Sequence, residues 1–240
     1  MPKEKVDRKR LLKEPDEFIS TSMRLMGWLR RNSRWVTAGA VLVVVCGVAF
    51  WGWRVYQSRI EAQAQDLFSQ AYGLYARAME ENQTAVSQDL LGRAAERFQA
   101  IIKQFPDTTA GWMARVYRGR ACYGLGKYPE AIEEFEAALA SLPSSGDGTM
   151  RAVALHGLGL ALQAKGDWDR AVRVFSSLKE TASGSFGRVA ELELAKCYEK
   201  QGNAKEALSL YRSLLGTLNE PLQREMIQAQ VARLSQSLKE

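Results

Sequence analysis

Residues 126–135, GKYPEAIEEF, decide the fold because the same pattern returns twice further along the chain. It recurs as GDWDRAVRVF at 166–175 and as GNAKEALSLY at 202–211. In each copy, alanine follows the glycine by five residues and an aromatic residue follows it by nine. The glycines lie 40 and 36 residues apart. A repeat of this length predicts a stack of similar supersecondary units.

The pattern predicts pairs of antiparallel helices joined by a tight turn at the glycine. The alanine would lie where the two helices are closest, and the aromatic residue would fill the space toward the next pair. A small residue also lies seven positions before each glycine, where the first helix must pack closely: Gly119, Gly159 and Ala195. The second helix of the first clear pair is expected to end at Pro143, before a loop at 144–148.

A more degenerate unit precedes these three. Its second helix repeats the spacing of alanine, phenylalanine and proline seen further on, with Ala94, Phe98, Ile101 and Pro106. Its first helix is expected over 54–81, where apolar residues recur every three or four positions, and a loop is expected at 82–88. At the other end, 221–238 predicts an amphipathic helix that closes the stack.

These features resemble the tetratricopeptide repeat, a helix pair of about 34 residues with small residues at two fixed positions and an aromatic residue at a third. The resemblance covers 90–220 well and 54–89 weakly. It departs from the family pattern at Arg115 and Glu191, where a tryptophan or leucine is usual. It implies an all-α fold, a right-handed helical solenoid of about four helix pairs that binds other proteins.

A hydrophobic segment precedes the repeats. Residues 35–53 contain no charged side chain, and tryptophans lie near both ends. As a helix the segment would be roughly 28 Å long, close to the roughly 30 Å of a bilayer's hydrocarbon core. A cleaved signal peptide is disfavoured by the 34-residue leader and by the bulky residues at 50–53. The sequence therefore predicts a single transmembrane helix.

Charge is distributed unequally about that segment. Residues 1–34 hold ten basic and five acidic side chains, so they carry +5 of the net charge of +6. Four arginines within 15–34, against two within 54–73, predict that the short arm stays in the cytoplasm. We therefore expect a single-pass protein of a bacterial inner membrane. Its parts are a basic cytoplasmic arm (1–34), a transmembrane helix (35–53), periplasmic repeats (54–220) and a C-terminal capping helix (221–240).

This combination, with the junction GWRVYQS at 52–58, resembles the YfgM family of inner-membrane proteins. The resemblance implies an ancillary partner of the protein-export translocon that works with a membrane-anchored periplasmic chaperone. One alternative is an envelope or cell-division scaffold that binds cell-wall or outer-membrane assembly proteins through the same repeats. Another is a cytoplasmic regulator whose basic arm binds nucleic acid or another anionic partner. Nucleic-acid binding is not expected, because the arm has few aromatic residues and no recognisable binding fold.

Few residues could support catalysis or metal binding. The chain has one histidine, His156, and cysteines only at 46, 122 and 197, without a ligand spacing or a triad. Cys122 and Cys197 are expected to be buried and too far apart for a disulfide. The glycines near 146–148 and 184–187 lack the Gly-Lys-Ser/Thr ending of a phosphate loop. We expect no enzymatic activity, no cofactor and no metal.

The acidic pair at 133–134 is interpreted as part of a solvated helix face. A partner-binding groove is predicted from the first helices of the pairs, which line the concave side of solenoids of this kind. The matching positions are Met113, Val116, Arg120 and Tyr123, then Val153, His156, Leu160 and Gln163, then Val189, Leu192, Lys196 and Glu199.

This mainly apolar stripe suits an extended or helical peptide. The expected partners are translocon subunits, a periplasmic chaperone or unfolded chains, with membrane lipids around residues 35–53 and beside the basic arm. An alternative is that residues 54–81 cover the stripe.

Overall fold

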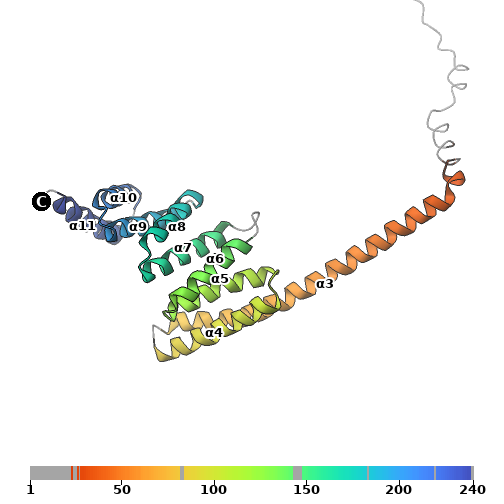
Figure 1. Cartoon of the computed structure of the whole chain (residues 1–240), viewed down its shortest axis with the longest axis horizontal. Coiled ribbons are helices and arrows are strands. Elements are labelled where there is room, and N and C mark those ends of the chain that lie inside the picture. Colours follow the sequence, from red (N-terminus) through yellow and green to blue (C-terminus); the bar gives the residue numbers. More distant parts are fainter. Residues whose placement is uncertain are drawn as a thin grey trace, which may run out of the picture. The chain divides into compact units, whose positions relative to one another are not determined.

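The computed structural model describes residues 28–81, 84–142, 148–182, 184–218 and 220–238, together with residues 23 and 26. Throughout this described part, all regular secondary structure is α-helical (Figure 1). The helices are α3 (Ser33–Glu80), α4 (Ala85–Gln104), α5 (Thr109–Gly124), α6 (Tyr128–Ser141), α7 (Gly148–Lys165), α8 (Trp168–Thr181), α9 (Ser185–Lys200), α10 (Ala204–Thr217) and α11 (Pro221–Ser237). The expectation of an all-α fold is confirmed. Pro143, the loop at 144–147 and most of the basic arm lie outside the described residues.

The chain divides into two compact units, Met1–Ser58 and Arg59–Glu240. In the first unit, every residue from 37 to 54 on α3 is solvent-exposed although most are apolar. Among the described helices, α3 alone is long and apolar enough to cross a membrane, and its most apolar stretch buries nothing against the protein.

The second unit is a series of helix pairs whose turns contain the glycines of the repeat. Gly126, Gly166 and Gly202 have φ of 73°, 83° and 80°, in the left-handed region that a side chain disfavours. At the first turn, the Gly126 N–H donates to the Tyr123 carbonyl at 3.0 Å and the Lys127 N–H to the Cys122 carbonyl at 2.9 Å. The same two bonds close the other two turns. This arrangement satisfies the last carbonyls of the first helix and reverses the chain.

The repeated alanines and aromatic residues form the core between the helices. Ala131, Ala171 and Ala207 are fully buried, as are Phe135 and Phe175. The buried residues form a central cluster over α5–α9, a cluster over α3–α5 and a smaller one over α9–α11. Cys122 and Cys197 are buried free thiols, as predicted. Each helix therefore depends on its neighbours in the stack, as expected for a solenoid.

The degenerate first unit is present, with one correction. The expected loop at 82–88 is too long, because α4 already begins at Ala85. The Thr84 side chain caps this helix by accepting from the Ser87 N–H at 3.2 Å. The Ser87 hydroxyl in turn donates to the Ala78 carbonyl at 2.8 Å, so the two helices are tied close to the turn.

The acidic pair at 133–134 is not a solvated face throughout, which corrects the sequence interpretation. Glu133 is exposed, but the Glu134 side chain is only 13% exposed. It forms an ion pair with Arg118, and the Arg115 guanidinium lies 3.9 Å from its second oxygen. Arg115, which replaces the usual apolar residue of the family, therefore lies within ion-pair distance of the Glu134 carboxylate.

Candidate functional site

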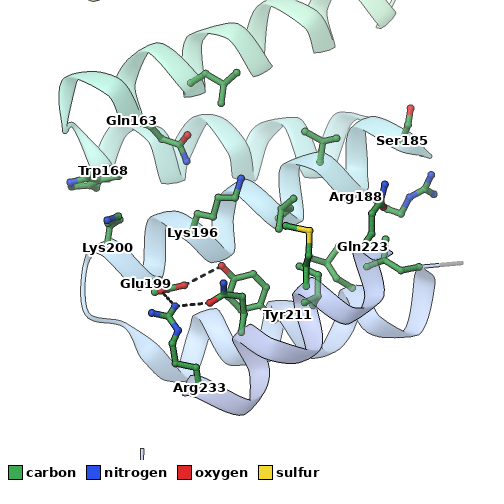
Figure 2. Close-up of a pocket in the computed structure, with 18 of the residues that line it drawn as sticks. Gln163, Trp168, Ser185, Arg188, Lys196, Glu199, Lys200, Tyr211, Gln223 and Arg233 are labelled. Atoms are coloured by element: carbon green, nitrogen blue, oxygen red, sulfur yellow. Dashed lines mark hydrogen bonds and ion pairs between the residues drawn. The ribbon is translucent and has the colours of Figure 1, made fainter. Parts of the chain in front are cut away.

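A groove runs along the first helices of the last pairs and has a volume of about 780 Å³. Its walls are α7, α9 and α11, and α10 contributes Tyr211 and Leu214 (Figure 2). Single side chains from α5 and α8 also line it. We call it the α7–α9–α11 groove. The apolar side chains that line it include Leu160, Val189, Leu192, Leu214, Leu218, Met226 and Ile227.

The structure brings more than half of the predicted stripe into this groove. The predicted residues that line it are Tyr123, Leu160, Gln163, Val189, Leu192, Lys196 and Glu199. They come from equivalent first helices, so the repeat register was sufficient to place them on one face. No residue of α3 is among those lining the groove, and all of α3 is described.

The other predicted residues lie outside the groove. Val116 is fully buried in the central cluster, which corrects its assignment as a contact residue. Met113 and Val153 are half-buried against the core. The Arg120 guanidinium lies 5.6 Å from the centre of the Tyr75 ring of α3 and 5.7 Å from that of Tyr117. At Arg120, the predicted stripe therefore contacts α3.

His156 is half-buried and does not line the groove. Its ring centre is 6.3 Å from that of Phe175. Burial lowers the pKa of His156, while the nearby Glu193 carboxylate opposes this shift. The neutral imidazole is therefore the favoured form, and the ring acts as a packed side chain.

Sequence reasoning missed the contribution of α11. This helix supplies Gln223, Met226, Ile227, Gln230 and Arg233 to the groove. Residues 221–240 were predicted from the sequence only as a cap. A signal was present in the order of the helices, because the helix after the last pair, α9 and α10, occupies the place of a further first helix. Its exposed Met226 continues the apolar lining.

Two polar networks hold the groove walls together. Glu199 accepts a hydrogen bond from the Tyr211 hydroxyl at 3.2 Å and pairs with Arg233 of α11. Burial, with the Glu199 carboxylate as a second cause, raises the pKa of Tyr211, so the hydroxyl stays protonated and can donate. Figure 2 shows Tyr211 and Arg233 converging on Glu199.

The second network joins α7 to α9. The Gln163 amide donates to the Glu193 carboxylate at 3.2 Å, and Lys196 pairs with the same carboxylate at 2.7 Å. The Gln163 amide is also 3.2 Å from the Cys197 sulfur. Gln163 is therefore a link between helices as well as a groove residue.

One protein family matches nearly the whole chain. This family, described as tetratricopeptide repeat-like domain, matches residues 27–236. The chain belongs to this family. The resemblance to the tetratricopeptide repeat is therefore confirmed. The helix pairs of the second unit are its tetratricopeptide repeat-like (TPR-like) repeats.

Solved structures share the TPR-like fold. A putative kinesin light chain from Podosopora anserina, with nearly identical TPR-like repeats, is 20% identical with a TM-score of 0.57, over 72% of this chain and 88% of that one. BtubC (BKLC) from P. vanneervenii is 14% identical with a TM-score of 0.51, over 76% of this chain and 84% of that one. At these identities the likeness is one of fold. No curated protein matches the sequence.

The TPR-like groove has the properties of a protein-binding surface. Apolar side chains along its floor offer contact area. The three glutamine amides in the lining, Gln163, Gln223 and Gln230, each already have a hydrogen-bond partner within the chain. Within the described residues, no group of three or more His, Cys, Asp or Glu side chains is arranged to hold a metal. TPR-like repeats indicate a role in protein–protein interaction, and the groove is the surface that fits it.

Proposed function

We propose that the protein is a membrane-anchored interaction scaffold of a bacterial inner membrane. Its TPR-like repeats would lie in the periplasm and serve protein export, as the resemblance to the YfgM family implies. The observation that carries the proposal is the joining of an exposed apolar helix to a TPR-like domain in one chain.

The apolar part of α3 supports the anchor. Exposed side chains there include Val41, Leu42, Val43 and Val44, each between 62% and 71% exposed. A continuous apolar surface of this kind is unfavourable in water and favourable in hydrocarbon. The excess of arginine on the N-terminal side favours a cytoplasmic arm.

Membrane insertion can be tested with two arginines placed in the apolar stretch. Val44→Arg combined with Val45→Arg should release the protein from membranes washed with alkaline carbonate, because each charge at mid-membrane costs about 2.5 kcal/mol or more. The matched control is Gln57→Arg combined with Ser58→Arg, which adds the same charge outside the stretch and should leave the protein in the membrane. Wild-type protein in the soluble fraction would refute the anchor.

The export role can be tested by photocrosslinking in intact cells. Probes at Leu160 and Met226 lie in the groove, and a probe at exposed Arg212 on α10 is the control. Groove-specific adducts with translocon subunits, a periplasmic chaperone or unfolded exported chains support the proposal. Adducts with cell-wall or outer-membrane assembly proteins would instead assign the scaffold to envelope construction or division.

A further inference from the structure

We propose that the α7–α9–α11 groove recognises an acidic amphipathic helix of its partner protein. The inference deepens the proposed protein-binding function and rests on it. The bound helix would carry apolar side chains on one face, flanked by carboxylates.

The lining of the groove has more cations than carboxylates. Its described lining contains four cations, Arg188, Lys196, Lys200 and Arg233, and one carboxylate, Glu199. Arg233 is already paired with Glu199, and Lys196 with Glu193. Within the described part of the chain, Arg188 and Lys200 have no carboxylate within ion-pair distance, and both are exposed. The groove therefore has two free cations for a partner's carboxylates.

The spacing of these two cations sets the length of a partner helix that could reach both. Figure 2 shows Arg188 at one end of the groove and Lys200 at the other. Both are on α9, twelve residues apart, which corresponds to roughly 18 Å along a helix. A partner helix of about three turns spans this distance, so acidic residues near its two ends would reach both cations.

The floor of the groove between these two cations is apolar. Val189 and Leu192 are spaced by one helical turn on α9, Leu160 faces them from α7 and Met226 from α11. An apolar surface supplied by three helices fits the apolar face of a helix, which presents its anchors at one-turn intervals. Met226 is 63% exposed, so its side chain is available to a partner without unfolding α11.

The chain's own flanking segment does not fit this groove. Residues 1–34 carry a charge of +5, which the cations at 188 and 200 would repel. A separate acidic partner therefore matches the groove better than this arm does.

Binding can be measured with three labelled peptides and the full chain in nanodiscs of zwitterionic lipid. The acidic peptide has 16 to 18 residues, about five helical turns, with leucines at one-turn spacing and glutamates beside them. The neutral peptide has glutamine in place of glutamate, and the scrambled peptide has the acidic composition without the helical spacing. Fluorescence anisotropy gives the three affinities after subtraction of empty nanodiscs.

We expect the acidic peptide to bind about tenfold more tightly than the neutral and scrambled peptides. Arg188→Glu combined with Lys200→Glu should weaken acidic-peptide binding by about tenfold or more. The matched control is Arg173→Glu combined with Arg212→Glu, which makes the same charge change at exposed positions outside the groove and should leave binding unchanged.

A second pair of variants tests the apolar floor. Met226→Gln should weaken binding about threefold or more, because it removes an apolar contact. Leu222→Gln should not, although Leu222 is on the same helix and 70% exposed, because it does not line the groove. Circular dichroism checks folding. If the double glutamate variant unfolds, Arg188→Gln combined with Lys200→Gln replaces it.

Equal binding of the three peptides, or unchanged binding after charge reversal in the groove, would overturn the inference. The two proposals can fail separately. If peptide selectivity holds but cellular crosslinks contain no export component, the export role is refuted and the groove chemistry stands. If the crosslinks identify export components but the acidic peptide shows no preference, the groove chemistry is refuted.

Discussion

Two glycines on α7 determine how closely the phenylalanines of the adjacent second helices can approach. A Cβ atom added at Gly157 would lie 2.3 Å from the Phe135 ring, and one added at Gly159 would lie 2.4 Å from the Phe175 ring. Both rings are fully buried, so neither can move without disturbing the core. These positions therefore require glycine for packing, whereas the turn glycines are required for backbone conformation.

We predict that Gly159→Ala lowers the free energy of unfolding by about 1–3 kcal/mol, because the added methyl group overpacks the core. Denaturant unfolding followed by circular dichroism measures the change. Gly92→Ala on α4 is the matched control, since a Cβ there meets nothing within 4 Å. It should stabilise the protein by about 0.5–1 kcal/mol through helix propensity. Equal effects at the two positions would contradict the packing argument.

His156 gives the chain a pH dependence that can be isolated. Burial holds its pKa below the ordinary 6.5, and Glu193, Arg120 and Lys196 are the charges that act on it. The unfolded chain therefore binds a proton at a higher pH than the folded chain does. Stability contributed by the neutral ring is present above pH 6.5 and is lost as the pH falls through that value toward the lower folded pKa.

We predict that the thermal midpoint falls more for wild type than for His156→Gln when the pH is lowered from about 7.5 to about 5.5. His156 is the one histidine in the sequence, so few other side chains change charge in this range. The measurement is thermal unfolding of the full chain in detergent at both pH values. Identical losses in the two proteins would show that folding does not lower the pKa of the imidazole.

At the scale of single helices, α5 and α6 are joined by a charge network that sequence reasoning interpreted incorrectly. Glu134 lies between Arg115 and Arg118 at the interface of these helices, with each side chain at most 25% exposed. Removing the carboxylate would leave two half-buried guanidinium groups facing each other.

We predict that Glu134→Gln lowers the free energy of unfolding by about 1–2 kcal/mol, whereas Glu133→Gln changes it by less than about 0.5 kcal/mol. The two residues are adjacent in sequence but differ in burial, so each serves as a control for the other. Denaturant unfolding of both variants gives the comparison. A neutral result at Glu134 would show that the arginines find water when the carboxylate is lost.

The helix pairs could be predicted from the sequence because each turn depends on one residue type, glycine. Gly126, Gly166 and Gly202 marked the turns because only glycine adopts positive φ without strain. The burial of the Glu134 side chain could not be predicted, because helical spacing does not show which neighbouring helix supplies its counter-ion. The wall formed by α11 was missed because an amphipathic pattern shows an apolar face without its partner.

At the scale of the whole molecule, the repeats form a unit whose core does not require the apolar half of α3. The unit begins at Arg59, and the α3 residues within its core begin at Ala64. The core part of α3 includes Phe68 and Tyr75, which pack with Phe98 of α4 and Tyr117 of α5.

We predict that a fragment of residues 59–240 is soluble, helical and cooperative in thermal unfolding. A fragment of residues 81–240 should aggregate or lose cooperativity, because it lacks the half of α3 that covers Phe98 and Leu91. Gel filtration and circular dichroism distinguish the two. A well-folded shorter fragment would show that α4 and α5 are stable without α3.

The fold class followed from the sequence because the repeat fixes both helix length and partner order. The composition of the groove followed only in part, because it depends on which first helices remain uncovered. Arg120 was predicted as a contact residue, but Tyr75 of α3 packs against it. Tyr123, one turn further along the same helix, reaches the groove rim.

The order of contacts along the stack has a consequence for folding kinetics. From α4 to α11, each helix contacts only the next helix or the next but one. Contacts between residues close in sequence require little loop closure, and chains rich in such contacts fold in about microseconds to milliseconds. Each pair can therefore dock as soon as its predecessor is formed, and the chain can acquire its structure progressively while its later residues are still being synthesised.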